Sequence, residues 1–254
     1  MTAPAAAPAV DVRRAADRPR TQIAWLDSSH SFSFGRHYDP RNTSHGVLLV
    51  NNDDVVRAGA GFETHPHRDM EIVTWVVQGS LVHQDSTGHS GVIHPGLAQR
   101  MSAGSGILHS EKNDAYRADG AYADVPVHFV QMWVAPAGSD RTPGYEQLEI
   151  GDARLRSGLV PVASGLGRHA GDTAITIGNA GAALHAARLS PGQVVDVPDA
   201  PWVHLFVAAG SVSLEGAGPL VAGDAVRLTG AGGRRLEALD PAEVLVWEMH
   251  VTLG

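Results

Sequence analysis

The chain contains no cysteine at any of its 254 positions. This absence excludes disulfide bonds, zinc ribbons, thiolate metal sites and cysteine nucleophiles. It also suits a reducing compartment. Together with the absence of a secretory signal, described next, it leads us to expect a cytoplasmic protein.

Long apolar runs and basic blocks are missing as well. No stretch approaches the roughly 18 apolar residues of a membrane helix. Residues 1–20 are rich in Ala, Pro and Arg and lack the apolar core of a secretory signal, so we expect a disordered leader there. The formal charge is −8, from 19 basic and 27 acidic residues. This balance argues against direct nucleic-acid binding, which requires a clustered basic surface.

The sequence shows little helical periodicity. It consists instead of short apolar segments separated by turn residues. Their spacing of roughly eight to twelve residues is typical of an all-β sandwich or barrel. Asn52, Asp53 and Asp54 read as a turn after the first of these segments. The expected strands are residues 46–51, 72–77, 81–84, 127–134, 183–189, 193–197, 202–207, 211–214, 223–228 and 244–249.

The two halves of the chain show the same order of expected strands and turn residues. A strand, Gly79, a second strand and Pro95-Gly96 in the first half resemble a strand, Gly210, a second strand and Gly223-Asp224 in the second. We therefore expect an internal duplication, with one β-barrel domain in residues 21–150 and a degenerate copy without metal ligands in residues 151–254. Ten of the fourteen histidines lie before Val130, so the chemistry is expected in the first half.

Two pairs of potential metal ligands stand out in the first half. His65 and His67 are two residues apart, and so are His109 and Glu111. Residues i and i+2 of a β-strand point to the same face, so each pair would project together. Three imidazoles and one carboxylate form a ligand set for a first-row transition metal. A polar core patch is the alternative interpretation.

These residues lie in motifs that resemble those of known proteins. Gly59, His65-x-His67, Glu71 and Gly79 resemble the first cupin motif, and Gly106-x-x-His109 with Asn113 resembles the end of the second. Residues 64–71 (THPHRDME) and 101–111 (MSAGSGILHSE) resemble the signature of the pirin family, in the bacterial branch that includes quercetin 2,3-dioxygenases. The resemblance covers about residues 21–150. It implies a bicupin, that is, two tandem cupin (jelly-roll) β-barrels.

The resemblance further implies one divalent transition metal held by His65, His67, His109 and Glu111. Iron(II) is the first candidate, and Ni, Cu, Co, Mn and Zn are also compatible. Most other cupins use a carboxylate at the position of Glu71 instead. Both glutamates are present here, so Glu71 in place of Glu111 as the carboxylate ligand is the alternative, and Glu71 is expected instead to orient a ligand imidazole by a hydrogen bond.

The implied activity is dioxygenation of a flavonol-like aromatic substrate by O2. The heterocycle opens with loss of carbon monoxide, and Glu111 accepts the substrate's proton. One alternative is a non-enzymatic, metal-binding regulator that acts through a protein partner. Another is a zinc-dependent isomerase or hydrolase. A monomer is the simplest assembly.

Other conspicuous side chains receive structural interpretations. His83 and His89 flank a turn and are expected at the surface. Trp25, Trp75 and Trp133 are expected to be core aromatics.

Overall fold

A computed structural model describes residues 8–114, 125–172 and 174–253. The prediction of an all-β protein is confirmed: the described residues form β-strands, one short α-helix, α1 (Asp152–Arg156), and single turns of 3-10 helix. None of the described helices has the length and apolar character needed to cross a membrane.

The first half of the chain forms two antiparallel sheets. The larger has seven strands in the order β12-β9-β6-β11-β4-β3-β2, and the smaller has four in the order β5-β10-β7-β8. Their bounds are β2 (Arg20–Gln22), β3 (Leu26–His30), β4 (Leu48–Val56), β5 (Gly61–His67), β6 (Glu71–Gln78), β7 (Leu81–Asp85), β8 (Ser90–Ile93), β9 (Leu97–Ser102), β10 (Ile107–Lys112), β11 (Val127–Val134) and β12 (Gly144–Glu149).

The second half repeats this arrangement. A seven-stranded sheet has the order β1-β20-β17-β22-β15-β13-β14, and a four-stranded sheet has the order β16-β21-β18-β19. The bounds are β1 (Ala9–Arg13), β13 (Val160–Ser164), β14 (Ile175–Thr176), β15 (Ala182–Leu189), β16 (Val194–Asp196), β17 (Trp202–Ala209), β18 (Ser211–Leu214), β19 (Gly218–Val221), β20 (Ala225–Thr229), β21 (Arg235–Ala238) and β22 (Ala242–Met249).

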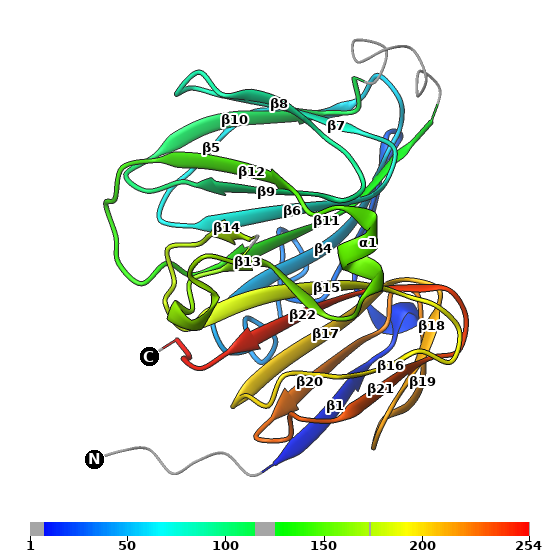
Figure 1. The fold of residues 1–254 in the computed structure, drawn as a ribbon. Coiled ribbons are helices and arrows are strands. Elements are labelled where there is room, and N and C mark those ends of the chain that lie inside the picture. The colour runs from blue at the N-terminus through cyan, green and yellow to red at the C-terminus, as the bar shows by residue number, and fades with distance from the viewer. Residues whose placement is uncertain (1–7, 115–124, 173, 254) are drawn as a thin grey trace.

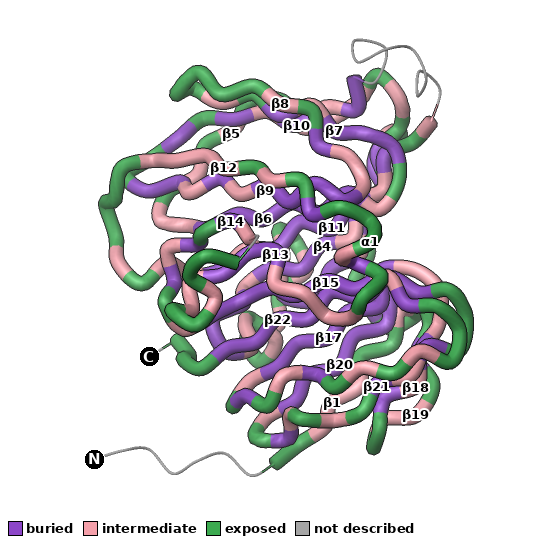
Figure 2. The backbone as a smooth tube through the Cα atoms, viewed as in Figure 1, coloured by how far each residue is buried: buried purple, intermediate pink, exposed green. Residues whose placement is uncertain are grey.

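The four sheets stack as layers, with the two large sheets in the middle and a small sheet on each outer side (Figure 1). Both faces of a large sheet are therefore covered. In β6, Val73 and Trp75 belong to the core shared by the two halves, whereas Thr74 and Val76 point into the first barrel. The central strands are accordingly buried along most of their length (Figure 2). A strand buried on both faces reads as a continuous apolar run rather than an alternating one.

The expectation of a disordered leader over residues 1–20 is wrong for the part that the structure describes. Residues 9–13 form β1, which pairs antiparallel with β20 in the second half of the chain. Val10 and Val12 pack against the core of the second barrel. These alternate apolar residues give β1 one buried face, a pattern that the Ala- and Pro-rich composition conceals. Residues 1–7 lie outside the described residues.

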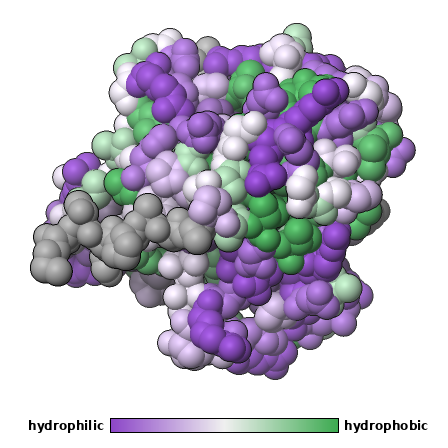
Figure 3. Space-filling view, turned by 90° about the horizontal axis from the view of Figure 1, so that it is seen from below, coloured by the Kyte–Doolittle hydropathy of each residue, from purple (hydrophilic) through white to green (hydrophobic). Residues whose placement is uncertain are grey.

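The outer surface is a mosaic of side-chain types. Seen from below, hydrophobic side chains are interspersed with hydrophilic ones over one face of the molecule (Figure 3). Among the large hydrophobic residues that are exposed, Leu108 lies on β10, Val221 on β19 and Tyr38 in the segment between β3 and β4.

Candidate metal centre

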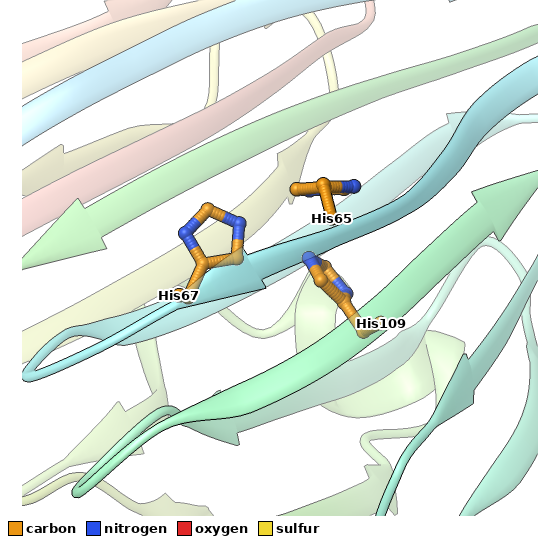
Figure 4. Close-up of side chains that lie close together, drawn as sticks. All are labelled: His65, His67 and His109. Carbon is orange, nitrogen blue, oxygen red and sulfur yellow. The ribbon is translucent and has the colours of Figure 1, made fainter.

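Three imidazoles converge inside the first barrel. His65 and His67 project from β5, and His109 projects from the neighbouring β10 (Figure 4). One ring nitrogen of each lies within 4.8 Å of the others. The centroid of the His65 ring lies 4.9 Å from that of His67 and 4.4 Å from that of His109. The structure thus brings together the three histidines that the strand spacing predicts.

A β-bulge sets the position of these rings. His109 pairs with His65 across the strands, but Glu111 pairs with Phe62, so Glu63 and Thr64 lie opposite Ser110 alone. The extra residue keeps His65 on the inner face of the barrel while the register changes. Close approach of the strands requires glycine at position 61, because a Cβ atom there would lie 2.3 Å from the backbone oxygen of Glu111.

The free nitrogens of these histidines fit a metal ion. Nε2 of His67 and Nε2 of His109 are buried and have no hydrogen-bond partner among the described residues. His65 Nδ1 lies 2.7 Å from the carbonyl oxygen of Glu63. It donates there and leaves the lone pair on Nε2, as in histidines that bind metals. A buried polar atom without a partner is costly, so these nitrogens need a ligand.

Two of the imidazoles, His67 and His109, are also in the protonation state that a metal needs. Burial, together with repulsion from His109 and His65, lowers the pKa of His67 to about 4. Burial and repulsion from His65 and His83 lower the pKa of His109 to about 3. Both rings are neutral at pH 7, and a neutral imidazole is the form that binds a metal.

Glu111 is held beside this triad by hydrogen bonds. Its carboxylate is buried, and Oε2 accepts a 2.7 Å hydrogen bond from the amide of Gln131. The amide oxygen of Gln131 in turn accepts a 3.0 Å hydrogen bond from Trp133, which fixes its orientation. Glu111 also lies within 4.8 Å of His109 and His83, measured between potential ligand atoms. Burial raises the pKa of Glu111, and His83 and Gln131 act in the opposite direction.

Glu71 does not orient an imidazole in this structure, which corrects that expectation. Its side chain leaves β6 on the face opposite Thr74 and points away from the barrel interior. The carboxylate accepts hydrogen bonds from Ser102 Oγ, at 2.8 Å, and from the backbone N–H of Gly178, at 3.0 Å. Gly178 belongs to the second half of the chain, so Glu71 ties the two halves together.

His83 is buried, and its expected place at the surface is wrong. None of its side chain is exposed, and its Nδ1 lies 3.5 Å from Nδ1 of His109. Its Nε2 lies 3.4 Å from the carboxylate of Asp85. The ring of Tyr145 stacks on the imidazole, with the two ring centroids 4.9 Å apart. His83 lies on β7 and pairs directly with Glu111 of β10, so it packs against the site from the neighbouring strand. By contrast, His89 is exposed as expected.

A row of polar side chains crosses the large sheet beneath the imidazoles. Its members are paired neighbours on successive strands, and they face the barrel interior: His30, Asn52, Gln131, Thr74 and Gln99. Apolar clusters lie on either side, one around Phe129 and one around Met101. A buried polar layer is expensive unless its groups are hydrogen-bonded, and here His30 bonds Asn52 and Gln131 bonds Glu111.

A cavity of about 590 Å³ opens onto this layer. His65, His67 and Glu111 line it together with Trp25 and Trp133, so these two tryptophans form cavity walls rather than core. Trp75 alone of the three tryptophans is fully buried in the core, as expected. The cavity also reaches four polar residues that the sequence analysis missed as site residues: Ser28, His30, Asn52 and Asp54.

The chain is similar to known proteins over most of its length. The profile of the Pirin family matches residues 11–134, and that of the quercetinase C-terminal cupin domain matches residues 162–249. Over 245 residues the chain is 60% identical to a Mycobacterium tuberculosis protein named "Putative quercetin 2,3-dioxygenase Rv0181c", covering 96% of this chain and 97% of the relative. It is 45% identical to the Escherichia coli quercetin 2,3-dioxygenase over 136 residues, 54% of this chain and 56% of that protein.

Solved structures give the same result for the whole fold. The crystal structure of YhhW from Escherichia coli superimposes with a TM-score of 0.83 at 32% identity and covers 97% of this chain and 100% of that one. A second structure, described as the bacterial pirin YhhW in complex with nickel(II), superimposes with a TM-score of 0.82 at 31% identity. It covers 96% of this chain and 100% of that one.

Proposed function

Because the chain belongs to the pirin family, we propose that it is a metal-dependent dioxygenase that opens the heterocycle of a flavonol such as quercetin with O2 and releases carbon monoxide. One observation carries the proposal. Buried, unpartnered imidazole nitrogens of His67 and His109 lie beside a carboxylate and an apolar-lined cavity of about 590 Å³. A concave apolar pocket with a few convergent polar groups is typical of a small-molecule site.

We propose that His65, His67, His109 and Glu111 hold one divalent metal ion. Iron(II) is the first candidate, and the nickel(II) complex of a relative makes nickel the second. The bound metal would supply an open coordination position and redox capacity for a chelating substrate and O2. His67 and His109 fit such an ion because their rings are neutral at pH 7 and their Nε2 atoms lack other partners among the described residues.

The chain's own residues would prepare the substrate. A flavonol must lose the proton of the hydroxyl group beside its ketone, and the carboxylate of Glu111 is the acceptor that we propose. The carboxylate is buried and lines the same cavity, so it lies beside the place where a chelating substrate would bind. Gln131 steadies the carboxylate through the 2.7 Å hydrogen bond, whereas Trp25 and Trp133 shield the reacting ring from water.

The cavity and the names of the relatives favour a dioxygenase over the two alternatives. A regulator that acts through a protein partner has no need of an apolar-lined chamber next to its metal. A hydrolase or isomerase that uses zinc as a Lewis acid would fit the same ligands, but the names of the relatives point to oxygen chemistry.

Oxygen uptake tests the proposal. Protein loaded with iron(II) or nickel(II) is mixed with quercetin, and the flavonol absorbance, dissolved O2 and released carbon monoxide are followed together. We expect loss of absorbance, matched by consumed O2 and evolved carbon monoxide. His67→Ala is expected to abolish all three signals. Metal-loaded protein that leaves both the flavonol and O2 unchanged would refute the proposal.

A further inference from the structure

One wall of the cavity carries a polar cluster whose purpose the metal centre leaves unexplained. Ser28 and His30 come from β3, and Asn52 and Asp54 come from β4. The strands pair so that Ser28 lies opposite Asp54 and His30 lies opposite Asn52. All four residues line the cavity. They belong to the seven-stranded sheet, whereas the imidazoles belong to the four-stranded sheet that faces it.

Two of these residues are already satisfied within the cluster. His30 Nδ1 lies 2.9 Å from the amide oxygen of Asn52, and its Nε2 lies 3.0 Å from the hydroxyl of Thr21. Both ring nitrogens of His30 are thereby occupied. This network holds Asn52 and His30 in place. The carboxyl group of Asp54, in the same cluster, takes no part in it.

Asp54 has unused hydrogen-bonding capacity. It is 3% exposed, and its Oδ1 has no hydrogen-bond partner among the described residues. Ser28 lies directly opposite Asp54 on the paired strand, where its hydroxyl lowers the pKa of the carboxyl group. Burial, with smaller contributions from the charges of Asp53 and Glu111, raises the pKa of Asp54 to about 7. The unpartnered Oδ1 can accept a hydrogen bond from a hydroxyl group of a ligand in the cavity.

Apolar side chains line the cavity together with this cluster and the imidazoles. Trp25, Phe34, Phe62 and Trp133 line the same cavity. Trp25 and Phe62 pack edge to face with ring centroids 5.3 Å apart, and Phe34 and Trp133 do so with centroids 5.5 Å apart. Aromatic walls of this kind suit a flat aromatic ligand. Such a ligand would meet the metal centre on one sheet and Asp54 on the other.

We propose that Asp54, backed by Ser28, is a specificity-determining residue that binds a hydroxyl group of the substrate outside the metal-chelating pair of oxygens. The inference rests on the proposed function and narrows its substrate class to aromatic chelators that carry a further hydroxyl group. A site built to hydrogen-bond a substrate hydroxyl rejects the analogue that lacks it, because the buried partner is then left unpaired.

Binding of two flavonols under anaerobic conditions tests this role. Quercetin carries several hydroxyl groups, whereas 3-hydroxyflavone keeps only the chelating pair. Their dissociation constants for the metal-loaded protein are measured by quenching of tryptophan fluorescence. Wild-type protein is expected to bind quercetin at least about tenfold more tightly than 3-hydroxyflavone. A ratio near one in the wild type would overturn the inference without any variant.

Three variants test whether Asp54 causes the preference for quercetin over 3-hydroxyflavone. Asp54→Leu is expected to weaken quercetin binding about tenfold and to leave 3-hydroxyflavone binding and metal content unchanged. Asp54→Asn keeps the shape and a hydrogen-bonding group and should retain most of the preference. Asp196→Leu, at an exposed carboxylate of β16 in the second barrel, is the matched control and should behave as wild type.

The outcomes separate this inference from the proposed function. Equal weakening of both flavonols in Asp54→Leu would mean a structural role and would overturn the inference, although the dioxygenase proposal would stand. An unchanged preference in that variant would also overturn it. If the wild-type protein bound neither flavonol, the proposed function would fail and this inference would fail with it.

Discussion

The ring of His109 connects the candidate metal centre to a chain of groups behind it. Its Nε2 faces the other two imidazoles, and its Nδ1 lies 3.5 Å from Nδ1 of His83. Asp85 lies at the far end, 3.4 Å from Nε2 of His83, and is itself held by the backbone N–H and the hydroxyl of Thr87. Such partners fix the tautomer of a metal-binding histidine and raise its basicity.

Loss of His83 should therefore weaken metal binding. We expect His83→Phe, which preserves the stacking on Tyr145, to lower the metal affinity about 10- to 100-fold, because His109 Nδ1 loses its partner. Competition with a chromophoric chelator measures the change. His89→Phe is the matched control, since His89 also stacks on Tyr145 but is exposed. Equal affinities in the two variants would contradict the role assigned to His83.

At this scale the sequence predicts the residues that lie two apart on a strand. The alternation of side chains along a strand is enough to predict that His65 and His67 share a face, and that His109 and Glu111 do. Asp54 and His83 were not predicted as site residues, because their meaning depends on neighbours that are distant in the chain. Asn52, Asp53 and Asp54 have the composition of a turn, yet they lie inside β4, where polar residues face a cavity. Local composition does not distinguish the two cases.

Among the elements, β1 has an unexpected place. It crosses from the N-terminus to the second barrel and covers the edge strand β20 over five paired residues. The segment that follows is anchored as well. Asp224 accepts hydrogen bonds from the side chain of Arg14, at 2.8 Å, and from the backbone N–H of Ala15, at 2.7 Å. An uncovered edge strand is prone to pair with other chains.

Removal of residues 1–13 should destabilise the protein. We expect a loss of the order of 2 kcal/mol in the free energy of unfolding, since Val10 and Val12 leave the core of the second barrel and β20 becomes an edge. Urea denaturation measures the loss, and light scattering measures aggregation. Removal of residues 1–7 is the control, because it leaves β1 intact. A 1–13 deletion as stable as this control would show that β1 contributes nothing.

For the whole molecule, the two halves depend on each other. The large sheets share one core, and the indole N–H of Trp75 donates a 2.5 Å hydrogen bond to Glu243 of the second half. Arg18 also bridges the halves, since it donates to the backbone oxygens of Gly223 and Ser29. The strand pattern predicts two similar barrels. It does not say which faces of their sheets meet, because both faces of a central strand are apolar.

Buried histidines at this junction predict a loss of stability in acid. His45 Nε2 donates to the carbonyl oxygens of Val203 and Leu228, at 3.1 and 3.2 Å. Burial lowers the pKa of His45 from 6.5 to about 4. The unfolded chain therefore binds a proton at a higher pH than the folded chain. The stabilisation is complete above pH 6.5 and is lost as the pH falls towards 4.

The effect should be visible by comparison with His45→Gln, which keeps an N–H donor but does not titrate. Between pH 7 and pH 4 we expect the wild type to lose more stability than the variant, by up to the order of 3 kcal/mol. Urea denaturation across this range gives both curves. Parallel curves would mean that His45 titrates normally in the folded protein.

Metal stoichiometry tests the central claim most directly, because the four proposed ligands are named and Glu71 is assigned a different task. Elemental analysis is carried out on purified wild type and on His65→Ala, Glu111→Gln and Glu71→Gln. We predict about one transition-metal ion per chain in the wild type and in Glu71→Gln, and a large loss in the other two variants. Full metal content in His65→Ala, or loss of the metal in Glu71→Gln alone, would contradict the proposed centre.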